Sequence, residues 1–102
     1  MKTFEELNEL VLNWADEKGI LDNALPANQY KKHVEEVGEL GEALMLNDKD
    51  LIDDAVGDIL VTLIILCDLV GTNPEHCLEG AYNIISKRTG KMQGGVFVKD
   101  GD

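Results

Sequence analysis

Five acidic side chains stand at spacings that could hold a metal ion. They fall in two segments of the chain, with Glu35, Glu36 and Glu39 in the first and Asp54 and Asp58 in the second. Residues three or four apart share one face of a helix, so each segment would present adjacent carboxylates. Carboxylate oxygens are ligands that Mg²⁺ prefers, and helical bundles hold metal ions between acids that project from facing helices. The spacing therefore predicts a magnesium site if the two segments form neighbouring helices.

A solvated surface is the alternative explanation for the first acidic segment. At about 100° per residue, Glu35, Glu39 and Glu42 fall opposite the apolar stripe of their segment. Asp58 favours the metal site, because apolar residues surround it in the sequence. A buried carboxylate needs a cation, a hydrogen-bond network or a raised pKa. A lysine such as Lys31 or Lys32 could also supply that cation, so both interpretations stay open.

Apolar residues recur at helical spacing in four stretches that must position these acids. They predict helices at about residues 4–18, 28–46, 51–70 and 74–88, with a loop over 19–27. Beyond Asp58 the third helix is apolar nearly all round, as expected of a central helix or one shared with a second subunit. The last 14 residues, 89–102, contain four glycines and predict an extended tail. The predicted fold is all-α: a four-helix bundle unit with a short extended C-terminal tail, completed by oligomerisation into a homodimer or homotetramer.

Composition limits the kinds of partner. The 102 residues predict one domain, 1–102, with a formal net charge of −11. Such a chain should repel nucleic-acid phosphates and anionic lipid, so neither nucleic acid nor a membrane is an expected partner. Its two cysteines have no paired spacing and are predicted to be reduced thiols. With no segment like a signal peptide at its start, the chain is expected in the cytoplasm, either bacterial or of a phage-infected host.

The order and separation of the acidic blocks resemble a known enzyme family. Residues 35–40 read EEVGEL and residues 54–60 read DAVGDIL, which together resemble the EExxE and ExxD blocks of MazG-like all-α nucleoside triphosphate pyrophosphohydrolases. The second block departs from that pattern, because Ala55 stands where the family has glutamate and the nearest acid is Asp54. Four later segments are similar to the small phage-type branch of the family: AYN (81–83), KR (87–88), GKM (90–92) and GVFVK (95–99).

The resemblance implies a hydrolase with Mg²⁺ as cofactor and Mn²⁺ as a substitute. Glu36, Glu39 and Asp58 would bind the metal, and the fourth ligand is open between Asp54, Glu35 and water. The bound ions would hold a triphosphate and activate a water that attacks the α-phosphorus, which yields a nucleoside monophosphate and pyrophosphate. Glu35, beside the ligands, is the candidate for orienting or deprotonating that water.

Basic and amide groups near the C-terminus are candidates for contacting the substrate. Asn83 and Lys87 are four residues apart and would share a helix face, and Arg88 and Lys91 follow in a chain with only nine basic residues. The alternative is a set of cations favoured by the dipole at the end of a helix.

The resemblance adds three substrate contacts in the first half of the chain. Trp14 and Gln29 would lie near the base and Lys32 near phosphate. The apolar stripe of the first helix favours Trp14 as a core residue instead. His33 and His76 have no partner at metal-ligand spacing; His33 is predicted to pack partly buried and His76 to lie on the surface.

Other function classes fit the sequence less well. A Nudix hydrolase would need Glu at Lys32, an aliphatic residue at Glu39, and strands that the sequence does not predict. A P-loop is excluded because no glycine-rich GK[ST] segment occurs. The non-enzymatic alternative is an acidic helical oligomer that mimics DNA or binds a partner protein. Mimicry predicts carboxylates spread over the surface, whereas here they cluster in two segments.

Overall fold

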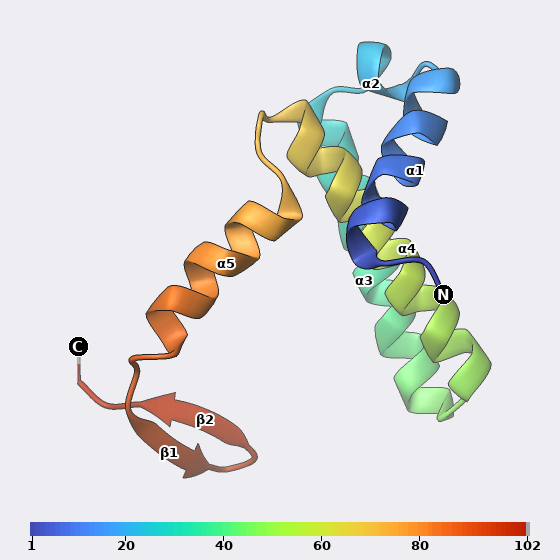
Figure 1. Cartoon of the computed structure of the whole chain (residues 1–102). Coiled ribbons are helices and arrows are strands. Elements are labelled where there is room, and N and C mark those ends of the chain that lie inside the picture. The colour runs from blue at the N-terminus through green and yellow to red at the C-terminus, as the bar shows by residue number, and fades with distance from the viewer. Residues whose placement is uncertain (102) are drawn as a thin grey trace.

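The computed structural model describes residues 1–101, and most of them are helical, in line with the predicted all-α class (Figure 1). The structure adds a short helix within the predicted loop, and two paired strands where an extended tail was expected. The elements in chain order are α1 (Phe4–Glu17), α2 (Ile20–Asn23), α3 (Pro26–Leu46), α4 (Lys49–Leu69), α5 (Pro74–Ile85), β1 (Gly90–Gln93) and β2 (Val96–Lys99).

The antiparallel pair of α3 and α4 is the centre of the fold (Figure 1). Its tight turn depends on two residues. Asn47 ends α3 in the left-handed conformation, with φ 51°, which asparagine tolerates better than most residues. The Asp48 side chain then accepts hydrogen bonds from the backbone N–H groups of Asp50 and Leu51 and so begins α4. Because the turn is short, the acidic segments of the two helices lie side by side.

A capping box begins α1, as predicted: the Thr3 side chain accepts from the Glu6 N–H, and the Glu6 carboxylate accepts from the Thr3 N–H. The Thr3 bond also holds the pKa of Glu6 below its ordinary value. Gly19, with φ 75°, turns the chain into α2. Helix α1 lies against α4, and Ala15 is its buried residue.

Helix α5 and the β1–β2 hairpin form a separate arm, defined here as residues 74–99 (Figure 1). The Asn73 side chain caps α5 by accepting from the His76 N–H at 2.8 Å. The α5 axis is bent by 98° from that of α4. The strands pair antiparallel from Gly90 opposite Lys99 to Gln93 opposite Val96, and the glycines at 94 and 95 supply the positive φ angles of the turn. Within residues 1–101, α5 contacts only α4 among the helices and strands.

The single chain has a thin core. Its buried apolar residues are Ala15, Ala43, Ala55, Ile64, Ile65 and Cys67, whereas 24 large apolar residues of the described chain are exposed. The radius of gyration is 16.2 Å, above the roughly 13 Å of a compact chain of 100 residues. No single helix in residues 1–101 is long and apolar enough to cross a membrane. The bent pair of α4 and α5 together has the length and composition of a broken membrane span, which is weak evidence for one. In one chain, α5 does not pack alongside the other long helices.

Candidate metal centre

Three of the predicted carboxylates converge between α3 and α4. Glu36, Glu39 and Asp58 each offer one oxygen, and these oxygens all lie within 4.8 Å of one another. Glu36 and Glu39 are one turn apart on α3, and Asp58 faces them from α4. The turn at 47–48 brings these positions together, since they lie at similar distances from it along their helices. This group is called the three-carboxylate cluster below.

Glu36 is the buried member of the cluster, with 8% of its surface exposed. Its pKa is raised above the ordinary value, first by a hydrogen bond shared with Glu39, then by burial and by the charge of Glu39; Lys32 opposes this shift. When both glutamates are ionised, Oε2 of Glu36 is buried without a hydrogen-bond partner in the described chain. A buried, unpaired carboxylate oxygen beside two further carboxylates has the donor set of a hard divalent cation. The residues present therefore fit Mg²⁺.

Lys32 forms the ion pairs of this region. Its Nζ lies 3.7 Å from Oε1 of Glu36 and 4.0 Å from Oε2 of Glu35. Glu35 is exposed, and within residues 1–101 it belongs neither to the three-carboxylate cluster nor to the cleft beside it. Lysine therefore neutralises part of the charge of Glu36, and the structure shows no ion pair of Lys32 with Asp58.

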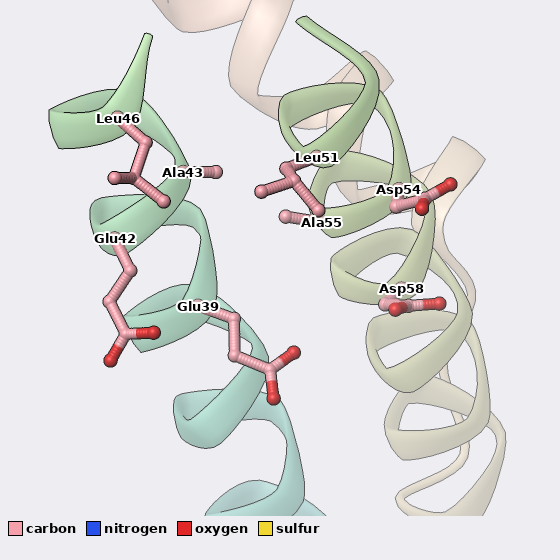
Figure 2. Close-up of a pocket in the computed structure, with 8 residues that line it drawn as sticks. All are labelled: Glu39, Glu42, Ala43, Leu46, Leu51, Asp54, Ala55 and Asp58. Carbon is pink, nitrogen blue, oxygen red and sulfur yellow. The ribbon is translucent and has the colours of Figure 1, made fainter. Parts of the chain in front are cut away.

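An open cleft of about 350 Å³ adjoins the cluster (Figure 2). Glu39 on α3 and Asp58 on α4 belong to both, and Asp54 stands one turn before Asp58 on the same helix. Ala55 is 5% exposed and faces α3, so the structure has a small buried side chain at the position that departs from the ExxD pattern. The cleft is lined by Glu39, Glu42, Ala43, Leu46, Leu51, Asp54, Ala55 and Asp58.

Comparisons with known proteins identify no family for this chain. No family model matches it, and no solved structure matches it. The chain is similar to an uncharacterized 18.2 kDa protein from the rep-hol intergenic region of Haemophilus phage HP1, with 32% identity over 66 residues. The match covers 65% of this chain and 40% of that protein, so the chain spans well under half the length of this relative.

A polar network joins α3 to α4 one turn beyond the cluster. The Thr62 hydroxyl donates to the backbone carbonyls of Asp58 and Ile59, at 3.1 and 3.0 Å. Its oxygen lies 2.9 Å from Nδ1 of His33. Because the only hydroxyl proton is directed at those carbonyls, His33 must donate from Nδ1. Gln29, 9% exposed, donates to the Thr62 carbonyl at 3.2 Å.

This network changes the interpretation of Gln29 and confirms that of His33. Gln29, expected near a base, is buried and joins two helices. His33 is partly buried, and His76 is exposed, as predicted. Thr62 was not identified as a site residue, although it is the polar residue that interrupts the apolar run of 59–67. Its bonds fix the backbone turn that carries Asp58, so we regard Thr62 as a positioning residue.

Trp14 is neither a core residue nor part of the acidic cleft. It is 47% exposed and lines an apolar hollow of about 310 Å³ with Leu7, Leu10 and Val11 of α1 and Val61 of α4. The core prediction is wrong because α1 contacts only α4 and the short helix α2 within residues 1–101, which leaves the far part of its apolar face open.

The remaining candidate residues lie on the arm. Asn83 is near the end of α5, Lys87 and Arg88 follow it, and Lys91 is in β1; all are exposed. Figure 1 shows the arm extending away from the α3–α4 pair. The structure therefore does not bring these four residues to the cleft of their own chain.

Proposed function

We propose that this protein is a magnesium-dependent nucleoside triphosphate pyrophosphohydrolase of the MazG-like kind. The observation that carries the proposal is the three-carboxylate cluster, in which Glu36, Glu39 and Asp58 place oxygens within 4.8 Å of one another. Oε2 of Glu36 supports it further, because with both glutamates ionised this buried oxygen has no hydrogen-bond partner among the described residues. A solvated acidic surface would not require a buried, unpaired oxygen at its centre.

In this proposal each residue of the cluster has a defined task. Glu36, Glu39 and Asp58 hold the cation, and Asp54 or water completes the shell from the cleft. When bound, Mg²⁺ neutralises phosphate oxygens and lowers the pKa of a coordinated water. Thr62 holds the turn that bears Asp58, and Lys32 limits the negative charge on Glu36. Mn²⁺ would serve in the same oxygen-ligand site.

The cleft beside the cluster gives the substrate a place to bind. Its volume of about 350 Å³ lies within the range of roughly 300–1,000 Å³ for small-molecule sites. A water attacking the α-phosphorus there would release pyrophosphate as the leaving group. Glu35 remains the proposed base, although its exposed carboxylate would have to leave Lys32 and turn toward the cleft.

The test is product analysis on a panel of deoxy- and ribonucleoside triphosphates with Mg²⁺ or Mn²⁺. We expect pyrophosphate and a nucleoside monophosphate in equal amounts, with no free phosphate. Asp58→Asn and Glu39→Gln should each abolish turnover, and Glu17→Gln is the matched control, because it removes the same charge from an exposed residue of α1 outside the cluster and the cleft. Release of orthophosphate, or equal activity in all variants, would contradict the proposal.

We further propose that the chain self-associates and that a second copy completes the four-helix arrangement. The exposed apolar residues of α1 and α5 support this, because a monomer would leave them in water. Size-exclusion chromatography with light scattering should give a dimer or tetramer of the 11.2 kDa chain. Neither nucleic acid nor a membrane is a proposed partner, because the net charge of −11 would repel nucleic-acid phosphates and anionic lipid.

A further inference from the structure

The arm has an apolar stripe that no other element in residues 1–101 of its own chain covers. Leu78, Tyr82 and Ile85 recur at positions i, i+4 and i+7 of α5, so they share one face. They are 70%, 61% and 53% exposed. The hairpin beyond α5 has two strands only, and an isolated two-stranded hairpin is marginally stable in water. The arm therefore requires another surface.

The connection between α4 and α5 keeps the arm from folding back. Gly71 has φ 80°, a left-handed conformation that ends α4. The Thr72 N–H donates to the Cys67 carbonyl at 2.9 Å, which closes the turn. Asn73 then caps α5 directly. With only residues 70–73 between the helices, α5 leaves at 98° to α4 and the surface it requires lies outside its own chain.

The charges of the arm and of the rest of the chain are opposite. Residues 86–99 contain four basic residues and no acidic one. Residues 1–72 contain 16 acidic and five basic residues. Four of these acids line the cleft: Glu39, Glu42, Asp54 and Asp58. A second copy of this chain therefore offers both the negative surface and, in the hollow beside Trp14, the apolar surface that the arm lacks.

The spacing of apolar and charged groups also matches. On α4, Val61 of the hollow follows Asp58 of the cleft by three residues. On the arm, Arg88 follows Ile85 by three residues, and its N–H donates to the Ile85 carbonyl in a single turn that follows the end of α5. Three residues correspond to about 4.5 Å along a helix. A helix placing Ile85 against Val61 would thus carry Arg88 alongside Asp58 if it runs antiparallel to α4.

We propose that α5 of one copy lies in the apolar hollow formed by α1 and α4 of a second copy, so that Lys87 and Arg88 reach the acidic cleft of that copy. Each site would then combine the three-carboxylate cluster of one chain with the cations of another. The role of these cations toward a triphosphate rests on the proposed function; the contact between arm and cleft does not. In a two-fold dimer the exchange is reciprocal and gives two equivalent sites.

A charge-swap experiment tests the contact without using activity. One variant carries Lys87→Glu and Arg88→Glu, and the other carries Glu42→Lys and Asp54→Lys. Each alone would place like charges together and should be monomeric by light scattering at moderate salt. Their mixture should form a heterodimer, because both of its contacts are attractive: a negative arm on a positive cleft, and the unchanged arm on the unchanged cleft. Failure to form the heterodimer, or homodimers as stable as wild type, would overturn the proposal.

A disulfide cross-link provides a second test in case a charge reversal disturbs folding. In a Cys77→Ser background, in which the remaining Cys67 is buried, Arg88→Cys and Glu42→Cys are made as separate chains of different mass. Oxidation of the mixture should join the unlike chains, whereas Lys2→Cys in place of Arg88→Cys should not give this product. Absence of the mixed product would overturn the inference. Hydrolysis is measured separately on the wild-type protein, in which the arm and the cleft are unchanged. A cross-link in the variants together with no hydrolysis by the wild type would reject the proposed function alone.

Discussion

Replacement of Glu36 by glutamine should have opposite effects on stability without and with Mg²⁺. In the metal-free protein, three carboxylate oxygens lie within 4.8 Å of one another, and Lys32 at 3.7 Å offsets only part of their charge. Glutamine has the shape of the protonated acid and can donate a hydrogen bond to Glu39. We therefore expect metal-free Glu36→Gln to be at least as stable as wild type at neutral pH.

With Mg²⁺ the order should invert. A ligand at ten times its Kd stabilises the folded state by about 1.4 kcal/mol. For a domain of 60–100 residues this corresponds to a rise in Tm of roughly 6–11 °C. Wild type should show this rise at a Mg²⁺ concentration ten times its Kd, and Glu36→Gln should show little of it at the same concentration, because the variant has lost the buried member of the ligand set. Glu42→Gln, with the same change of charge one turn from Glu39, should respond as wild type does.

The pH dependence of the metal-free protein independently predicts which of wild type and Glu36→Gln is more stable. The pKa of Glu36 is raised above 4.5 in the folded state. The folded protein thus holds this proton more tightly than the unfolded chain. The resulting stabilisation is complete below the unfolded pKa and is lost as the pH rises through the higher folded value. Wild type should therefore lose stability relative to Glu36→Gln over that interval.

Differential scanning calorimetry in EDTA and in a Mg²⁺ series, at acid and neutral pH, measures all of these quantities. The reasoning is refuted if metal-free Glu36→Gln is clearly less stable than wild type at neutral pH while its response to Mg²⁺ is unchanged. That result would mean that Glu36 acts through its ion pair with Lys32 alone, and that no cation is needed at the cluster.

Three further changes test the elements that position the site. Thr62→Val removes the acceptor of the His33 N–H and should cost about 1–3 kcal/mol in urea unfolding; most of that loss should disappear when His33→Ala is the starting protein, and additive losses would argue against the network. Ala55→Glu places a charge at a position only 5% exposed and should lower the free energy of unfolding by more than about 1 kcal/mol without Mg²⁺, partly recovered with it; unchanged stability would show that the position is open to the cleft. Asp48→Ala removes the cap of α4 and should cost about 1 kcal/mol by chemical denaturation, whereas a neutral result would mean that packing alone sets the turn between the central helices.

The helices were predictable because their signals are local. The capping box at Thr3, the start of α5 at Asn73 and the glycine after α4 each act within a few residues of their position. The β1–β2 hairpin was missed because four glycines in a short segment indicate a flexible chain as readily as a turn between strands. The helix α2 was missed because four residues are too few to show a helical period.

In the candidate site too, features set by local spacing were predictable and features set by helix packing were not. The spacing of Glu36, Glu39 and Asp58 predicted their shared surface, because the helices that carry them are joined by a short turn. The burial of Glu36, its ion pair with Lys32 and the bonds of Gln29 could not be predicted, because each depends on which face of α3 meets α4. Trp14 failed as a core residue for a related reason: a periodic pattern shows that a face is apolar but not whether another element covers it.

The sequence by itself determined the helical class, the limits of the main helices and the two acidic blocks, since hydrogen bonds and side-chain periods over a few residues decide these features. Only the tertiary structure decided which acids converge, that Ala55 is buried against α3, and that the arm stands apart from the cleft. These features depend on the rotation of α3 and α4 about their axes and on the direction that the chain takes after Gly71 at the end of α4. Both follow from packing between residues distant in the sequence, which no local pattern encodes.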